Sequence, residues 1–238
     1  MTTNRIFPQF TPDHTKGEAA FGWFWLLVHM FVLPLLFAVL MPEEDSAMTV
    51  NYVYYGVSTA VVMLVFLKLL RREFDHLLDR FWHCFRTFFA AYCFWYALSL
   101  LIAAIMTALG IEATPPNDQA VDVLAQENFG GVLVISVIAA PIVEEVLFRG
   151  ILFQSIRKRS RVWAYIASLA VFGLYHTWQF ALLYQDPKYL LFSLQYIPIT
   201  FALTWSYERS GSLWTAIFFH ATNNSRGLSC TDHVAILH

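Results

Sequence analysis

The sequence predicts an all-α bundle of transmembrane helices, a polytopic membrane domain with about seven spans. Two properties of the composition support this prediction, because 58% of the 238 residues are hydrophobic and only 13% are charged. A soluble domain is about 45–50% apolar and about 25% charged, so this chain lacks the polar residues that would cover a globule in water. The net charge of −2 excludes a nucleic-acid-binding protein, because no basic surface is available for phosphates.

The third observation is that the apolar residues come in long runs. A helix needs about 20 residues to cross a hydrocarbon core of about 30 Å. The first three runs hold no charged residue, whereas the fourth is interrupted by Glu144, Glu145 and Arg149. The predicted spans are residues 19–41, a stretch within 46–67, a stretch within 87–111, 129–156, 162–185, 189–207 and 210–225.

The distribution of Lys and Arg predicts the orientation of the spans. With the amino terminus inside, twelve of the fifteen basic residues fall on the cytoplasmic side, and the outer loops 42–50 and 112–128 contain none. The positive-inside rule therefore predicts a cytoplasmic amino terminus and an external carboxyl terminus. The twelve residues are Arg5, Lys16, Lys68, Arg71, Arg72, Arg80, Arg86, Arg157, Lys158, Arg159, Arg161 and Arg209.

Residues 74–85, between the second and third spans, have an amphipathic pattern. Their apolar side chains recur at helical spacing, and the charged residues in and beside the segment lie mostly on the other faces. One interpretation is a helix that lies on the cytoplasmic interface of the bilayer. The alternative is a cytoplasmic extension of the two adjacent spans.

The charged residues inside the fourth span are the first candidates for a functional site. A charge at the centre of a membrane helix costs about 2.5–3.5 kcal/mol on insertion scales. Glu145 and Arg149 are four residues apart, so they can form a salt bridge, which suits a structural role as a buried ion pair. Glu144 points about 100° away from Glu145 around the helix axis, so it cannot easily share this salt bridge. It is left as an unpaired acid within the membrane, which makes it a candidate for function. Pro141, one turn earlier, is expected to kink the helix and to free a carbonyl near Val137.

Two intramembrane histidines are the candidate partners of Glu144. Glu144, His176 and His220 lie 13, 15 and 11 residues from the basic residue at the cytoplasmic end of their spans. At 1.5 Å per residue these depths are about 16–23 Å, so the three groups can meet in one layer of the membrane. Asn224 is four residues after His220 and faces the same side. His29 has no polar neighbour at helical spacing and is interpreted as a packing residue.

Three short motifs lie on these spans. They are Glu-Glu-x-x-x-Arg, which begins at Glu144, Phe-x-x-x-His from Phe172 to His176, and His-x-x-x-Asn from His220 to Asn224. Together they resemble the CPBP family of intramembrane glutamate proteases, which includes CAAX proteases and bacteriocin-processing (Abi) proteins. The tripeptide at 212–214 is also similar to the start of the third family motif. The resemblance covers about residues 138–228.

The resemblance implies an intramembrane endopeptidase that uses neither a metal nor another cofactor. Glu144 would activate water with the help of His176, while His220 and Asn224 would donate hydrogen bonds to the oxyanion. The supporting residues would be Glu145, Arg149 and Phe172.

The resemblance also implies the organisation and setting of the chain. Residues 131–238 would form the catalytic helices, and residues 1–130 the amino-terminal transmembrane helices and the interfacial segment, in one integrated membrane domain. The partners would be the lipid bilayer and a membrane protein or lipidated peptide, cleaved near its membrane-embedded or lipid-modified terminus. A bacterial member would lie in the inner membrane.

Three other interpretations remain open at this point. Two carboxylates and two histidines could bind zinc in a metal-dependent version of the same hydrolase. A non-catalytic immunity or scaffold protein could use the polar cluster to join helices. A proton-coupled transporter is the third, although the two halves of the chain do not resemble inverted repeats.

Overall fold

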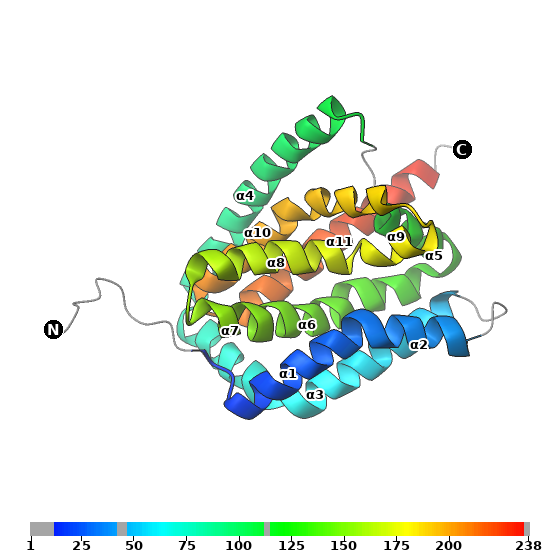
Figure 1. The fold of residues 1–238 in the computed structure, drawn as a ribbon. Helices are drawn as coiled ribbons and strands as arrows, with labels where there is room; N and C mark the ends of the chain where they lie inside the picture. Colours follow the sequence, from blue (N-terminus) through cyan, green and yellow to red (C-terminus); the bar gives the residue numbers. More distant parts are fainter. Residues whose placement is uncertain (1–11, 42–46, 112–114, 236–238) are drawn as a thin grey trace.

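The computed structural model describes residues 12–41, 47–111 and 115–235, and the regular structure of these residues is helical, without a strand (Figure 1). The predicted all-α class is therefore confirmed. The elements in chain order are α1 (Lys16–Leu27), the π-helical turn Val28–Val32, α2 (Leu33–Leu40), α3 (Ala47–Asp79), α4 (Phe81–Ala108), α5 (Pro116–Val134), the π-helical turn Ile135–Ala139, α6 (Ala140–Glu145), the π-helical stretch Val146–Phe153, α7 (Gln154–Arg157), α8 (Arg161–Tyr175), α9 (Trp178–Leu183), the 3₁₀ helix Pro187–Tyr196, α10 (Ile197–Ser210) and α11 (Leu213–Ala235).

Four of the described helices are long and apolar enough to cross a membrane. They are Lys16–Leu40, Ala47–Asp79, Phe81–Ala108 and Pro116–Arg157, and they coincide with the first four predicted spans. The chain is thus a multi-pass membrane protein. Its orientation stays a prediction, and Arg5 and parts of both outer loops (42–46 and 112–114) lie outside the described residues.

The last three predicted spans do not coincide with a described helix of this kind, and their crossing of the membrane stays a prediction. The run 162–185 is divided, because α8 ends at Tyr175 and α9 begins at Trp178. At this break the backbone N–H of Thr177 donates to the carbonyl of Leu174 (3.0 Å), and the Thr177 hydroxyl donates to the carbonyl of Gly173 (3.0 Å). The run 189–207 begins in the 3₁₀ helix and becomes α-helical at Ile197. Gly211 then ends α10 with a positive φ of 70°, before the last predicted span continues as α11.

The amphipathic segment 74–85 does not form a separate interfacial helix. α3 continues through it to Asp79, and α4 begins at Phe81. The break is at Arg80, whose φ of −129° and ψ of 33° are not helical. No Gly or Pro precedes this point within the segment, so the helix of the second span simply extends. The structure thus agrees with the alternative interpretation, an extension of the two adjacent helices.

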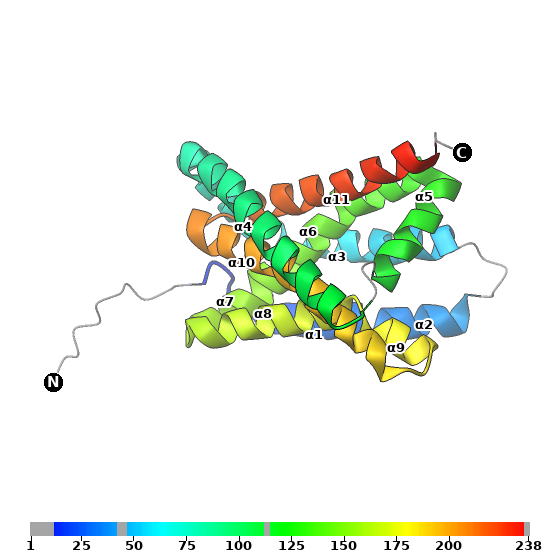
Figure 2. The ribbon, with the colours of Figure 1, turned by 90° about the horizontal axis from the view of Figure 1, so that it is seen from above.

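The helix Pro116–Arg157 forms the centre of the bundle. Its side chains at 143–154 are all buried, and Figure 1 shows α6 and α7 between α8 and α1. By contrast, only 6% of the most apolar window of α4 is buried, against 61% for the central helix. Figure 2 shows α4 crossing over α10 and α8 at the outside of the bundle. The polar residues of the fourth span are therefore held inside the protein, away from lipid.

Close packing of α1 on the central helix leads to a stability prediction. A Cβ atom added at Gly22 would lie 2.6 Å from the Cγ1 atom of Ile151. We expect Gly22→Ala to destabilise the fold by about 1–3 kcal/mol, because overpacking forces neighbouring side chains to move. Gly56→Ala in α3 is the matched control, because nothing lies within 4 Å of its added Cβ. Thermal unfolding in detergent should show a lower midpoint for Gly22→Ala and no decrease for Gly56→Ala.

Candidate active site

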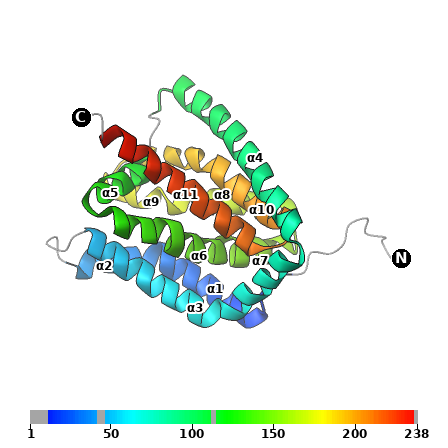
Figure 3. The same ribbon diagram turned by 180° about the vertical axis from the view of Figure 1, so that it is seen from behind.

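The four predicted catalytic residues line one cavity of about 1080 Å³. Glu144 comes from α6, His176 from the carboxyl end of α8, and His220 and Asn224 from α11. Figure 3 shows α11 lying along α6. The structure thus brings together the residues that their depth in the predicted spans placed in one layer.

Glu144 is almost completely buried, with 3% of its surface exposed. Its Oε1 atom accepts a hydrogen bond from the hydroxyl of Tyr55 (3.2 Å). Its Oε2 atom has no hydrogen bond from the described residues and lies 3.8 Å from Nε2 of His220. One carboxylate oxygen is therefore held in place, while the other is buried without a hydrogen bond from the described residues.

Glu145 and Arg149 form the predicted salt bridge, and both are fully buried. Nη1 of Arg149 donates to Oε1 of Glu145 (2.9 Å). The same oxygen accepts a hydrogen bond from Nδ1 of His220 (2.8 Å). The guanidinium also lies over the ring of Phe172, with 4.6 Å between the guanidinium carbon and the ring centroid. Glu145 therefore orients the candidate catalytic imidazole of His220, and Arg149 and Phe172 surround that contact.

His176 is the residue that follows the last turn of α8. Because a carbonyl can only accept, its Nδ1–H donates to the carbonyl of Phe172 (3.0 Å). The ring stacks on Tyr196, with centroids 4.5 Å apart and 25° between the planes. These contacts fix the ring and leave Nε2 as a hydrogen-bond acceptor at the cavity.

Asn224 contacts the central helix at its π-helical turn. Its Nδ2 group donates to the carbonyl of Ser136 (2.8 Å). The expected free carbonyl near Val137 is thus found one residue earlier. In a π-helix each N–H pairs with the carbonyl five residues before it, so Pro141, which has no N–H, leaves Ser136 unpaired. The second N–H of the Asn224 amide is still available to a ligand.

A chain of hydrogen bonds behind Glu144 was missed by sequence reasoning. The hydroxyl of Tyr55, which donates to Glu144, lies 3.4 Å from that of Tyr175, and Tyr175 lies 3.1 Å from Nε2 of His29. Nδ1 of His29 lies 3.0 Å from the hydroxyl of Ser58. One consistent direction of donation runs from Ser58 through His29, Tyr175 and Tyr55 to the carboxylate. His29 is a satisfied buried residue, as interpreted, but its partners come from other helices.

A signal for these linked hydrogen bonds behind Glu144 is present in the sequence. Tyr54, Tyr55 and Ser58 lie in the more polar half of an uncharged span, and Tyr175 precedes the candidate His176. Tyr54 also takes part, because its hydroxyl donates to the carbonyl of His29 (2.9 Å). Helical spacing compares positions within one helix, so it could not indicate that these side chains from three helices meet.

The comparisons with known proteins agree with the motifs. Residues 126–226 match the family described as "Type II CAAX prenyl endopeptidase Rce1-like". A curated relative, "Putative membrane peptidase YdiL" of Bacillus subtilis (strain 168), is 30% identical over 118 residues. The aligned part spans 49% of this chain and 43% of the length of that relative. No solved structure matches the chain. The resemblance to CAAX proteases is therefore confirmed for residues 126–226, which are similar to the Rce1-like type II CAAX prenyl endopeptidases.

Proposed function

We propose that the chain is an intramembrane endopeptidase of the glutamate type. It hydrolyses a peptide bond near the membrane-embedded or lipid-modified terminus of its substrate. The match of residues 126–226 to CAAX endopeptidases supports the peptidase class. The observation that supports the glutamate mechanism is the state of Glu144, a buried carboxylate at a cavity with one oxygen held and one oxygen free.

The first step is the activation of water. A water molecule bound between Oε2 of Glu144 and Nε2 of His176 would lose a proton to the carboxylate and attack the carbonyl carbon of the scissile bond. The protonated Glu144 would then give that proton to the leaving amine. Both residues line the cavity, and each keeps the relevant atom free of other hydrogen bonds among the described residues.

The second step is stabilisation of the oxyanion. His220 and Asn224 face the cavity from α11, and each has an N–H group to offer. Nδ1 of His220 donates to Glu145, so Nε2 can donate to the oxyanion only when the ring carries an N–H at both nitrogens.

The size of the cavity suits a peptide segment. Its volume of about 1080 Å³ is just above the range of about 300–1,000 Å³ for sites of small ligands. It continues from Glu144 to Met41 at the end of α2 and Met48 at the start of α3. We therefore propose that an extended stretch of substrate lies along it.

The experiment that tests this function is mass-spectrometric mapping of peptide termini in membranes. Membranes that contain the native chain are compared with membranes that contain Glu144→Gln at equal abundance. The expected result is a set of new termini, close to transmembrane segments or lipidated residues, in the native sample alone. Identical termini in both samples would contradict the proposal and favour a non-catalytic role.

Tyr55 gives a prediction about the positioning of the base. We expect Tyr55→Phe to lower kcat about ten- to a hundredfold, because a hydrogen bond to a charged group is worth about 1.5–3 kcal/mol. KM should change little, because Tyr55 contacts the carboxylate through its hydroxyl. Steady-state cleavage of a fluorogenic prenylated peptide in liposomes measures both constants. Tyr96→Phe, at an exposed position of α4, is the matched control; equal kcat for the two variants would rule out the role of Tyr55.

A further inference from the structure

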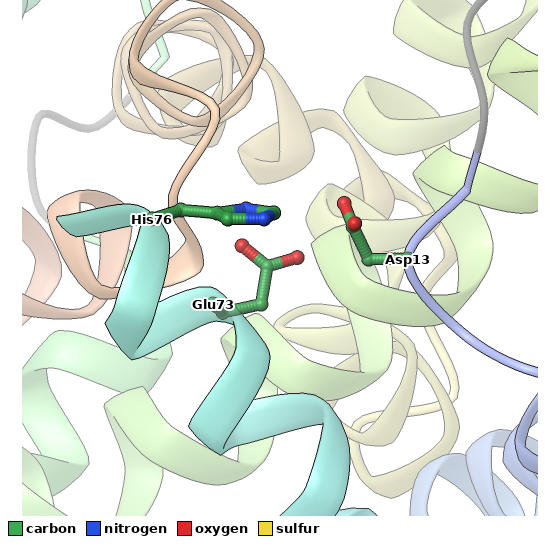
Figure 4. Close-up of side chains that lie close together, drawn as sticks. All are labelled: Asp13, Glu73 and His76. Atoms are coloured by element: carbon green, nitrogen blue, oxygen red, sulfur yellow. The ribbon is translucent and has the colours of Figure 1, made fainter. Parts of the chain in front are cut away.

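A second cluster of polar side chains lies at the end of the bundle where α3 ends and α11 begins. Potential ligand atoms of Asp13, Glu73 and His76 lie within 4.8 Å of one another. Figure 4 shows the Glu73 carboxylate between the ring of His76 and the carboxylate of Asp13. None of the three residues belongs to the cavity of Glu144. The mechanism proposed above makes no use of them.

Glu73 is fully buried and is held by three donors. Its Oε1 atom accepts from Nε2 of Gln154 and from the hydroxyl of Tyr207, each at 3.2 Å. Its Oε2 atom accepts from the backbone N–H of Leu213 (2.7 Å). A carboxylate has about four lone-pair sites, so one site of Oε2 remains for a further partner, such as a cation.

His76 has the tautomer and anchoring of a metal-binding histidine. Its Nδ1 lies 3.0 Å from the carbonyl of Gly211, so Nδ1 carries the proton and donates it. Nε2 then has a lone pair, and no hydrogen bond to it is found from the described residues. Metal-ligating histidines typically donate their second ring N–H to a carbonyl in this way, which fixes the ring and its tautomer.

Asp13 is fixed through its backbone. Its N–H donates to Oε1 of Gln154 (2.6 Å), and its carbonyl accepts from Nη2 of Arg72 (2.8 Å). Gln154 therefore joins Asp13 to Glu73. The guanidinium of Arg72 forms its salt bridge with Glu18 (2.9 Å), so it does not neutralise both Asp13 and Glu73.

We propose that Asp13, Glu73 and His76 bind one divalent transition-metal ion, of which zinc is the representative. One imidazole nitrogen and two carboxylate oxygens are accepted zinc ligands, and water would complete a tetrahedral set. Ligand atoms at about 2.0–2.2 Å from zinc lie roughly 3.4 Å apart in that geometry, so binding requires atoms that are now within 4.8 Å of one another to close by up to about 1.4 Å. This site is independent of the proposed protease function.

The place of this site gives the ion a structural role. The ion would connect the segment before α1 to α3, and Glu73 is already bonded to the first residue of α11. The hydroxyl of Ser212 in addition donates to the backbone carbonyl of Glu73 (2.7 Å). Because α11 carries His220 at the other site, metal binding would fix the start of the helix that holds a catalytic candidate.

Titration of the full-length, chelator-stripped protein in detergent tests this inference, with Zn²⁺ alone as the probe. We expect one zinc ion per chain by elemental analysis, a higher thermal midpoint, and binding that is weaker by at least about tenfold in Asp13→Asn and His76→Gln. Co²⁺ as a second probe should give the visible absorption of a four-coordinate ion, and His76→Gln should lose it. Both substitutions are at half-buried positions and spare the buried Glu73.

Two further variants show where the metal binds. Asp75→Asn, on the exposed side of the same helix turn, should leave zinc binding unchanged. Glu144→Gln should also leave it unchanged, which separates this site from a zinc ion at the catalytic cluster and from any failure of the proposed protease function. The inference is overturned if the native chain retains no zinc, or if His76→Gln and Asp13→Asn bind zinc as tightly as the native chain.

Discussion

Glu144→Gln should lower turnover by about 10²–10⁴-fold, the contribution of a general base, while the protein remains folded. Glutamine has nearly the same shape, and its amide oxygen can still accept the hydrogen bond from Tyr55. It cannot take a proton from water, so substrate can bind but water is not activated. The measurement is the rate of cleavage of a fluorogenic prenylated peptide in liposomes, together with the thermal midpoint of the variant.

Two variants serve as controls for this result. Glu127→Gln makes the same chemical change on the same long helix at an exposed position, and it should retain full activity. Glu144→Asp keeps the carboxylate but withdraws it by about one methylene, so its rate should fall between those of the native chain and Glu144→Gln. Full activity of Glu144→Gln would show that another group activates the water and would end the glutamate mechanism.

Arg149→Met is expected to have the largest effect on stability, a loss of about 3–5 kcal/mol in the free energy of unfolding. Arg149 and Glu145 have no exposed side-chain surface. Removing the guanidinium leaves a buried carboxylate with only His220 as a partner, and an uncompensated buried charge is strongly destabilising. Reversible unfolding in mixed micelles with increasing SDS measures the difference.

The double variant Glu145→Gln/Arg149→Met separates loss of the ion pair from loss of packing. Removing both charges of a buried pair is often far less harmful than removing one, and the amide oxygen of glutamine can still accept from Nδ1 of His220. We expect the double variant to recover much of the stability lost in Arg149→Met. A double variant less stable than the single one would mean that the guanidinium acts mainly through its contact with Phe172.

Local spacing was sufficient to predict the core of the site. The four-residue separation of Glu145 and Arg149 predicted their salt bridge, which is present at 2.9 Å. Depth within each apolar run predicted that Glu144, His176 and His220 share one layer, and they line one cavity. Both predictions use distances along a single helix, which the backbone geometry sets directly. The catalytic roles of these residues stay predictions.

Features that depend on contacts between helices were not predictable in this way. The 162–185 run holds no charged residue and no proline, so its sequence pattern does not predict that α8 ends at Tyr175. The support of Glu144 by Tyr55 joins residues 89 positions apart. The shift of the free carbonyl to Ser136 follows from a π-helical turn, which has no reliable signature in a single sequence.

The position of Glu144, Glu145 and Arg149 on the central helix also determines which partners these charges have while the chain is being inserted into the membrane. The ribosome delivers this helix after Tyr55 but long before His220, so during insertion Glu145 has Arg149 as its nearest available counter-ion. The intrahelical pair thus lowers the barrier to entering the bilayer at the moment when no later helix can help. During synthesis the fourth hydrophobic segment can therefore be inserted before α11. Glu145 then has Arg149 as a partner but still lacks its contact with His220.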